Sequence, residues 1–509
     1  MNTDRFFNNM KAETNNALTE NGANVYATTT QPLVDMVALI GSMRACPDRD
    51  VIDLFLNAFN QDKLIATKLI FYFRDIREGQ GERKIFRTIM RYLACNYPEI
   101  VEKNITYIPE FGRWDDLLEF IDTPCQQIAF EIIERQLKSD IDNKNPSLLA
   151  KWLPSRNASS KDTKYKAYKL MTYLNLTERE YRIILSSLRK RIDIIETKIT
   201  KQKYSDINYS TVPSCANKKY YKLFWKYDTD RYQDFISRIN KGDKSVKINS
   251  KDLFPHEIIR EILNNSDTSR FGYSYYSSQD KYTANDIQKD MSLKALWNAI
   301  PNYITEPGND VLCVIDTSGS MSFNNYLPLS VAIALGLYFA ERNKGRFKNK
   351  FITFSERPKA VELQGDDICS KTRDVLRYSE VANTNIAAVF DLILNTAKKY
   401  NLAAEEIPKK LIIISDMQFD SQTSGINRDT EKLMNYVRNK WNGSGYRFPS
   451  LTYWNVEGRN KNFPDVDSAG VQFISGFSPK IFNELIQDVS SMELVMKIAN
   501  KERYNCITV

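Results

Sequence analysis

The sequence predicts a multidomain protein, with an all-α helical array in its N-terminal half and a doubly wound α/β domain at its C-terminal end. Two observations lead to this prediction. From Pro32, apolar residues recur at three- and four-residue spacing, as in amphipathic helices. From Asp310, short apolar segments alternate with helical ones, as in βαβ units. The length of 509 residues provides material for roughly two to four domains.

The N-terminal half divides into an arm and a helical domain. Residues 1–30 are polar and rich in Asn and Thr, which predicts a flexible arm. Residues 31–300 predict short amphipathic helices joined by tight turns, such as the one at Gly79 and Gly81, but no fixed repeat period is visible. Over 177–204 we expect one long basic helix that begins with a capping box, because a threonine is followed three residues later by a glutamate.

The C-terminal domain is expected over residues 301–509. Two segments, 311–316 and 410–416, are apolar on both faces, as central parallel strands are. The strands are expected at 311–316, 350–355, 360–363, 410–416, 451–456 and 471–475, and the helices at 326–342, 387–400, 429–441 and 479–490.

Composition excludes several classes of protein. Apolar residues make up 42% and charged residues 26% of the chain, which excludes a mostly disordered protein. We expect no membrane span and no secretory signal, hence a cytoplasmic, intracellular protein. Seven scattered cysteines predict reduced thiols and no structural zinc. The one histidine, His256, excludes two-histidine metal sites and is expected to be structural.

A basic segment lies at residues 151–260, which contain 25 Lys and Arg against 12 Asp and Glu, whereas the net charge of the whole chain is +8. The same segment is rich in tyrosine. Cations interleaved with aromatic rings suit a nucleic-acid surface, because lysines neutralise phosphates and rings stack on unpaired bases. The alternative is a solvated helical face whose tyrosines fill a core. The composition leaves both interpretations open.

The clearest chemical motif follows the strand expected at 311–316. Asp316, Ser318 and Ser320 place a carboxylate and two hydroxyls on one tight turn, where open α/β sheets bind ligands. Two further loops, 383–385 and 415–416, are expected at the same sheet edge. Oxygen donors without imidazole or thiolate suit Mg²⁺, and Mn²⁺ or Ca²⁺ would also fit. The alternative is that these residues only cap the following helix.

The segment DTSGSM, with Thr384 and Asp416 downstream, resembles the metal-ion-dependent adhesion site (MIDAS) of von Willebrand factor A (vWA) domains, which have a Rossmann-like fold. By this resemblance Asp316, Ser318 and Ser320 match the first motif, Thr384 the second and Asp416 the third. The resemblance implies a metal-dependent binding module in which the ion keeps an open position for a ligand carboxylate.

A helical half followed by a vWA-like domain resembles the TROVE/Ro ribonucleoprotein architecture, whose helical half is a HEAT-like repeat. The segments RDIREGQGERKIFRTIM, FGRWDDLL, KWLPS, YRIILSSLRKRIDIIETK and YSTVPSCA look closer to a related family of unknown function from eukaryotes and large DNA viruses. The TROVE/Ro resemblance implies RNA binding. The candidate RNA contacts are Arg189, Lys190, Arg191, Lys198, Lys201, Lys203, Lys218 and Lys219.

Three functions compete on these observations. We expect a non-enzymatic binding protein that holds RNA in a ribonucleoprotein-like manner. The alternative is a protein–protein scaffold that binds a partner carboxylate at the metal, without nucleic acid. A metal-dependent hydrolase is disfavoured, because there is no P-loop, no kinase signature and no general base beyond carboxylates.

Overall fold

A computed structural model of the chain describes residues 14–250, 253–263, 284–305, 310–354, 356–378, 384–420 and 432–509. The chain forms two compact units. The first, which we term the sheet unit, comprises Met1–Pro47 and Leu253–Ile498. The second, the helical unit, comprises Asp48–Asp252 and Ala499–Val509. This division differs from the boundaries expected at residues 30 and 300. Residues 1–47 belong to the sheet unit, which resumes at residue 253, and residues 499–509 belong to the helical unit.

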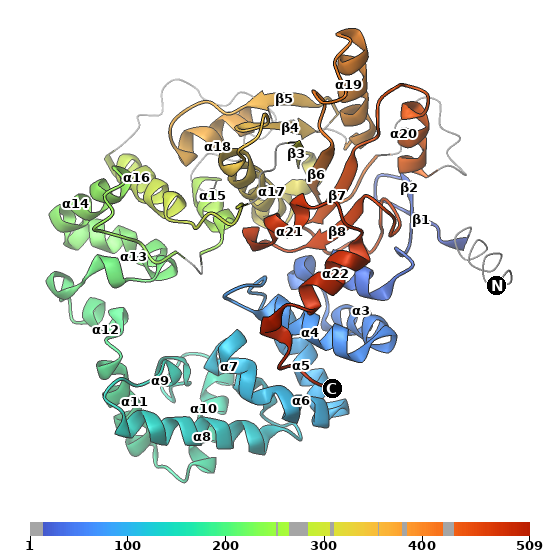
Figure 1. The fold of residues 1–509 in the computed structure, drawn as a ribbon. Coiled ribbons are helices and arrows are strands. Elements are labelled where there is room, and N and C mark those ends of the chain that lie inside the picture. Colours follow the sequence, from blue (N-terminus) through green and yellow to red (C-terminus); the bar gives the residue numbers. More distant parts are fainter. Residues whose placement is uncertain are drawn as a thin grey trace. The chain divides into compact units, whose positions relative to one another are not determined.

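The sheet unit is built on a six-stranded sheet of order β5-β4-β3-β6-β7-β8 (Figure 1). All neighbouring pairs are parallel except β4 and β5. The strands are β3 (Val311–Asp316), β4 (Lys350–Phe354), β5 (Lys359–Glu362), β6 (Lys410–Ser415), β7 (Ser450–Asn455) and β8 (Val471–Ser475). All six lie at the positions predicted from the sequence, to within about one residue.

The sheet has a topological switch point between β3 and β6, which are parallel neighbours. From β3 the chain crosses to β4 on one side, and it later returns to place β6 on the other side. Every residue of β3 and β6 is buried, as the apolar residues on both faces of each strand predict, and the polar residues at the strand ends, Asp316, Lys410 and Ser415, are buried with them. Ligands of open α/β sheets bind at such a switch point, beyond the carboxyl ends of the strands. Asp316 ends β3, and Asp416 follows β6.

Helices cover the sheet. α17 (Phe323–Arg342) packs on β3, β4 and β6, and α15 (Pro255–Leu263) packs on α17. Among the described residues, one helical stretch, Gly319–Arg342, has the length and hydropathy of a membrane span, but 72% of its apolar window is buried inside the protein, as in a core helix. The remaining helices of this unit are α16 (Ala284–Asn298), α18 (Ile368–Arg377), α19 (Ile386–Lys399), α20 (Leu433–Trp441), α21 (Phe482–Ile486) and α22 (Ser491–Ala499).

The described part of the N-terminal arm is folded. Residues 14–30 contain a small hairpin of β1 (Ala17–Leu18) and β2 (Asn24–Val25), and α2 (Pro32–Leu39) follows and packs on β7 and β8. Val25 is fully buried. This differs from the flexible arm expected over residues 1–30, of which 1–13 lie outside the described residues. Asn15, Thr19 and Asn21 of the arm form side-chain hydrogen bonds within the sheet unit, so a polar composition does not make this segment a flexible arm.

The helical unit contains helices and no β-strand among its described residues. Buried apolar side chains on successive amphipathic helices form its core, as expected from the helical spacing. Its α-helices are α3 (Asp48–Gln61), α4 (Lys63–Arg74), α5 (Lys84–Asn96), α6 (Pro98–Asn104), α7 (Ile108–Phe111), α8 (Gln126–Asp142), α9 (Leu149–Trp152), α10 (Lys161–Tyr173), α11 (Glu178–Arg191), α12 (Ile195–Thr200), α13 (Ser214–Tyr227) and α14 (Thr229–Asn240).

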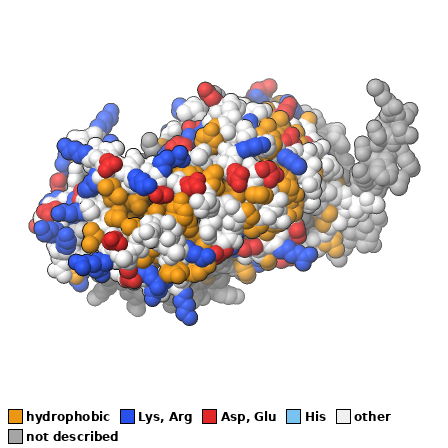
Figure 2. Space-filling model, turned by 90° about the horizontal axis from the view of Figure 1, so that it is seen from below, with side chains coloured by type: hydrophobic (Ala, Val, Ile, Leu, Met, Phe, Trp, Pro, Cys, Tyr) orange, Lys and Arg blue, Asp and Glu red, His pale blue; other side chains and the backbone are white. Residues whose placement is uncertain are grey.

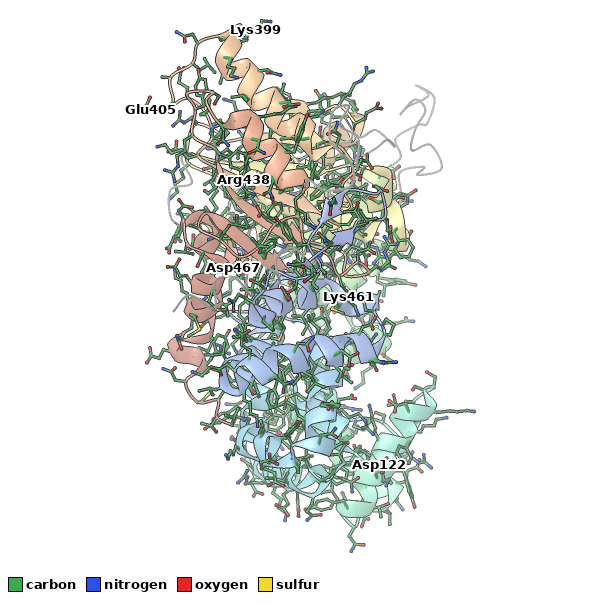
Figure 3. The ribbon with its side chains drawn as sticks, turned by 90° about the vertical axis from the view of Figure 1, so that its right-hand side faces the viewer. Asp122, Lys399, Glu405, Arg438, Lys461 and Asp467 are labelled. Carbon is green, nitrogen blue, oxygen red and sulfur yellow. The ribbon has the colours of Figure 1, made fainter. Side chains whose placement is uncertain are left out.

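Polar contacts fix the turns of this unit. Asp116 in the 3₁₀ helix η3 (Trp114–Phe120) forms an ion pair with Arg74 at 2.6 Å, and both side chains are buried. Asp122, labelled in Figure 3, accepts from Lys169 at 2.7 Å and from the Tyr165 hydroxyl at 2.8 Å, which ties α10 to the end of η3. Gly79 lies in a tight turn, where an added Cβ would lie 1.9 Å from the Tyr72 carbonyl oxygen.

The basic helix expected over 177–204 is interrupted. Its start is as predicted, because Thr177 and Glu180 form the reciprocal hydrogen bonds of a capping box. The helix ends at Arg191, and Asp193 has a φ of +57°, so α12 begins as a separate helix. Asp193 takes the left-handed conformation that aspartate tolerates better than most residues.

Candidate functional site

The turn after β3 gathers three of the predicted oxygen donors. The Ser318 amide donates to Asp316 Oδ1 at 2.9 Å, and the hydroxyls of Ser318 and Ser320 lie 3.1 Å apart. Asp316 is fully buried, and Ser318 is 4% exposed. A buried carboxylate is therefore held at the end of the central strand, with two hydroxyl groups beside it.

The loop after β6 brings the second carboxylate to the same place. The Ser415 hydroxyl donates to Asp316 Oδ2, and the Gln418 amide donates to Asp416 Oδ1 at 3.1 Å. Burial raises the pKa of Asp416, and the Ser320 side chain lies close enough to oppose that rise. Asp416 is 1% exposed, yet its Oδ2 atom accepts no hydrogen bond. A buried carboxylate oxygen without a donor is rare in folded proteins and calls for a missing partner.

The electrostatics of the pair favour a cation. Burial first, and the negative charge of Asp416 second, raise the pKa of the Asp316 carboxyl to about 7. Burial likewise raises the pKa of Asp416, although the positive charge of Arg459 opposes this. Two like charges at one buried point raise each other's pKa, and a divalent cation between them would reverse that effect. The residues present therefore fit a hard divalent ion.

The loop at residue 384 lies beside the segment that follows Asp416. Thr384 is 2% exposed, and its carbonyl accepts a hydrogen bond from the Asp420 amide at 2.9 Å. We call Asp316, Ser318, Ser320 and Asp416 the cluster. The side chain of Asn385 caps α19, because its Oδ1 accepts from the Ala388 amide at 3.1 Å, and so does not join the cluster. Asn383, the other polar residue predicted in this loop, lies outside the described residues.

The backbone after the first turn is strained. Asn324, Asn325 and Tyr326 have φ values of +49°, +54° and +57°, and the regular part of α17 begins only after them. Three consecutive residues in the left-handed region are costly, and such strain is found most often at functional sites. This strain begins four residues after Ser320, past the 3₁₀ turn Gly319–Ser322.

In the part of the chain that the structure describes, no group of three or more His, Cys, Asp or Glu side chains could hold an ion, and the candidate site itself has only two carboxylates. His256 is 5% exposed and packs against the rings of Phe254 and Phe477, which is the structural role expected for it. The donor set at the switch point is thus two carboxylates supplemented by hydroxyls, a set that suits Mg²⁺.

One neighbour of the cluster was missed by sequence reasoning. The turn between β1 and β2 lies against the loop after Asp416: the Thr19 hydroxyl donates to the Phe419 carbonyl at 2.6 Å, and the Glu20 amide donates to Gln418 Oε1 at 2.8 Å. Nothing in the sequence links two segments almost 400 positions apart, and the polar composition of the arm predicted the opposite.

The predicted RNA contacts fall into different environments. Arg189 donates to the carbonyls of Ala150 and Leu153, both at 2.8 Å, and to the Ser155 hydroxyl at 2.9 Å. Its guanidinium therefore holds α9 in place, and we leave it out of the candidate contacts. Arg191 donates to the Ile141 carbonyl at 3.1 Å.

The lysines of the set are more accessible. Lys198 pairs with Asp193 at 2.6 Å, and Lys219 lies over the Tyr220 ring at 4.9 Å. Lys190, Lys201 and Lys203 are exposed and form no ion pair with any residue that the structure describes. Lys218, the remaining member, is half-buried on α13. One face of the protein carries Lys and Arg side chains mixed with acidic and hydrophobic ones (Figure 2).

Half of the ten tyrosines of the basic segment, residues 151–260, are buried. Tyr209 and Tyr232 pack with Phe224 and Phe235 in an aromatic cluster, with ring centroids 5.0–6.3 Å apart. Tyr181, Tyr204 and Tyr221 are buried too. For these five tyrosines, the interpretation as core residues is confirmed.

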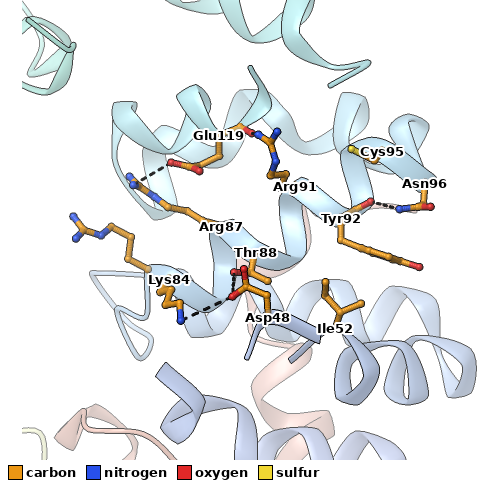
Figure 4. Close-up of a pocket in the computed structure, with 11 residues that line it drawn as sticks. Asp48, Ile52, Lys84, Arg87, Thr88, Arg91, Tyr92, Cys95, Asn96 and Glu119 are labelled. Carbon is orange, nitrogen blue, oxygen red and sulfur yellow. Dashed lines mark hydrogen bonds and ion pairs between the residues drawn. The ribbon is translucent and has the colours of Figure 1, made fainter. Parts of the chain in front are cut away.

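A pocket of about 590 Å³ lies along α5 in the helical unit (Figure 4). Several of its cations are engaged with the protein: Arg87 pairs with Glu119 at 3.3 Å, and Arg91 donates to the carbonyls of Glu119 and Ile121 at 2.8 and 3.0 Å. Lys84 lies 3.9 Å from Asp48. These three cations are therefore neutralised or hydrogen-bonded within the chain, whereas Arg83, which also lines the pocket, is exposed.

The fold and the cluster define a two-unit protein in which an α-helical unit accompanies an α/β unit with buried carboxylates and hydroxyls at its switch point. The chain belongs to the family described as Domain of unknown function (DUF2828), which matches residues 19–146 and 146–309. A second family, Domain of unknown function (DUF7788), matches residues 310–505, the range that holds Asp316, Thr384 and Asp416.

A relative from a large DNA virus also resembles this chain along nearly its whole length. It is Uncharacterized protein L728 of Acanthamoeba polyphaga mimivirus, 30% identical over 536 residues, which cover 96% of this chain and 86% of the relative. The two family matches meet at residues 309 and 310, near the boundary that was expected at residue 300.

Proposed function

We propose that this protein is a non-enzymatic binding protein whose sheet unit is a vWA-like module. In it, Asp316, Ser318, Ser320, Thr384 and Asp416 hold Mg²⁺, and the ion binds a carboxylate of a protein partner. The observation that carries the proposal is the buried Oδ2 of Asp416, which has no hydrogen-bond partner although it lies at the switch point beside a second buried carboxylate.

The donor chemistry supports binding over catalysis. Hydroxyl and carboxylate oxygens are hard ligands that suit Mg²⁺, and Mn²⁺ or Ca²⁺ would also fit. A coordination shell with only two carboxylates leaves the metal ion electrophilic, and an electrophilic ion favours the binding of an anionic ligand. Hydrolysis would need a general base to activate water, and no histidine is available for this role beside the cluster, since His256 packs against phenylalanine rings.

Calorimetric titration of the purified full chain with Mg²⁺, and separately with Mn²⁺, tests the metal site. We expect one ion to bind to the native protein and measurable binding to be lost in Asp416→Asn. Asp391→Asn is a matched control, because Asp391 lies on α19 of the same unit and pairs with Lys440 at 2.9 Å. Equal binding by the native protein and Asp416→Asn would refute the proposed site.

The partner can be tested by affinity capture with the full chain. Partners that bind through the metal should be lost with EDTA and with Asp416→Asn, but should survive nuclease treatment. Partners that remain after both metal treatments would contradict binding through a carboxylate.

RNA binding by the helical unit, in the manner of TROVE/Ro proteins, is a second candidate function. Three exposed lysines support it, Lys190, Lys201 and Lys203, which form no ion pair with a described residue. Phosphate contacts of this kind give affinities that fall steeply with salt.

Gel shifts with a structured RNA at several salt concentrations test this candidate. Replacing the three lysines by glutamine should weaken binding and reduce the slope of log affinity against log salt by roughly two to three. The same change at Lys241, Lys244 and Lys247, which are also exposed, is the control. Binding that is absent or independent of salt would exclude the RNA function.

A further inference from the structure

The hairpin of β1 and β2 is fixed against the candidate metal site. Its turn, residues 19–22, makes a β-bridge between Gly22 and Asp420. The Asn21 side chain donates to the Gln418 carbonyl at 2.7 Å, and the Thr19 hydroxyl donates to the Phe419 carbonyl at 2.6 Å. The turn is thus bonded to each of the three residues that begin two positions after Asp416.

A short chain of hydrogen bonds leads from Glu20 to the cluster. The Glu20 amide donates to Gln418 Oε1 at 2.8 Å, and the Gln418 amide donates in turn to Asp416 Oδ1 at 3.1 Å. The Glu20 side chain is exposed, in contrast to the buried carboxylates beside it. The backbone of Glu20 is thus joined to Asp416 through Gln418.

The other end of the hairpin is anchored by a buried lysine. Lys432, 8% exposed, donates from Nζ to Asn16 Oδ1 at 2.6 Å, to Asn24 Oδ1 at 3.0 Å and to the Val25 carbonyl. Ala23 and Val25 are buried as well. Because both ends of the hairpin are held, the position of its turn beside Asp416 is defined by the fold and is not that of a loose arm.

We propose that Glu20 is an internal ligand of the metal site: its carboxylate takes the coordination position that a partner carboxylate would use, and it must leave before the partner can bind. This inference rests on the proposed metal site and names its regulation. The hairpin carries the right chemical group, on an exposed side chain, next to the loop that supplies Asp416.

The local charge permits a third carboxylate. A divalent ion would balance the charges of Asp316 and Asp416, and Arg459, which follows β7 beside β6, adds positive charge that it shares with Glu457. Arg459 pairs with Glu457 at 3.5 Å and lies 3.5 Å from the centroid of the Phe323 ring, so it is held beside the strained turn.

The water bound to the metal provides a direct test. With Mn²⁺ bound to the full chain, water-proton relaxation counts the exchangeable waters on the ion, and acetate serves as a carboxylate probe. We expect Glu20→Gln to add one metal-bound water, to weaken Mn²⁺ binding several-fold and to strengthen the competition by acetate. Glu405→Gln, a change at an exposed glutamate of the same unit, should change none of these values.

A second variant tests the role of the hairpin. Thr19→Val removes the hydroxyl that donates to the Phe419 carbonyl and accepts from the Ala23 amide. It should raise the mean number of metal-bound waters by less than Glu20→Gln does. If the native protein binds Mn²⁺ and Glu20→Gln leaves hydration and affinity unchanged, the internal ligand is refuted and the metal site stands. If the native protein binds no Mn²⁺, both proposals fail.

Discussion

Arg503 donates to both carboxylate oxygens of Asp75, from Nε at 2.5 Å and from Nη2 at 3.0 Å, although 428 positions separate the two residues. Asp75 is fully buried at the end of α4, and the Tyr504 hydroxyl donates to it at 3.1 Å. The last residues of the chain are therefore part of the core of the helical unit, not a free tail.

Arg503→Ala should destabilise the helical unit by about 3–5 kcal/mol, because it leaves a buried carboxylate without its charged partner. Urea denaturation followed by far-UV circular dichroism measures the change. Arg49→Ala is the control, since that side chain is 90% exposed and should contribute less than about 0.5 kcal/mol. Equal stability of the two variants would contradict a structural role for the C-terminal segment.

Arg189→Ala should also destabilise the helical unit, by about 2–3 kcal/mol, because it removes hydrogen bonds from a charged group to two carbonyls and a hydroxyl. The adjacent Lys190→Ala changes an exposed side chain and should have almost no effect on stability. Thermal unfolding of the two variants distinguishes these roles. A destabilised Lys190→Ala and an unchanged Arg189→Ala would reverse our assignment.

Lys410 gives the sheet unit a pH dependence. Its Nζ donates to Gln472 Oε1 at 2.7 Å and to the Gln487 carbonyl at 2.8 Å, and burial lowers its pKa to about 8. In the unfolded chain the pKa of lysine is about 10.4. Between these two pH values the unfolded chain binds more protons, so the free energy of unfolding rises with pH.

Relative to Lys410→Met, the native protein should therefore gain on the order of 1–3 kcal/mol of stability between about pH 7.5 and pH 10. Denaturation curves of both proteins at the two pH values provide the measurement, and the difference between them removes the contribution of other titrating groups. Parallel pH dependence of the two proteins would show that Lys410 titrates normally.

Much of the α/β architecture could be predicted from local sequence. The segments 311–316 and 410–416 carry apolar residues on both faces between their polar ends, and they form the adjacent central strands of the sheet. The turn at 316–320 could be predicted as well, because a carboxylate and two hydroxyls follow a buried strand directly. The meeting of Asp316 with Asp416 followed from the rule that ligands lie at the carboxyl ends of parallel strands.

Contacts between distant segments could not be predicted in this way. Polar side chains such as Thr19 and Asn21 look solvated in sequence, but they bond to the backbone after Asp416. Arg189 looked like a surface cation, yet the carbonyls that it binds come from α9 and the turn after it, and no periodicity indicates that contact. In each case the hydrogen-bond partner lies in another segment of the chain, and no local sequence pattern indicates it.

Removing one charge of the carboxylate pair should stabilise the metal-free protein. Asp416→Asn keeps an oxygen to accept from the Gln418 amide but ends the repulsion with Asp316, so in EDTA its free energy of unfolding should rise by about 1–3 kcal/mol. Mg²⁺ should raise the melting temperature of the native protein and leave that of the variant unchanged. A variant that is less stable than the native protein in EDTA would contradict a site built for a cation.

Anomalous diffraction from crystals of the full chain grown with Mn²⁺ tests the metal site most directly. We predict a peak at the manganese edge within about 2.0–2.6 Å of carboxylate or hydroxyl oxygens of Asp316, Ser318, Ser320, Thr384 or Asp416. Crystals of Asp416→Asn should lack that peak. Electron density with water or a protein side chain on Asp416 Oδ2, and no anomalous signal there, would contradict the proposal.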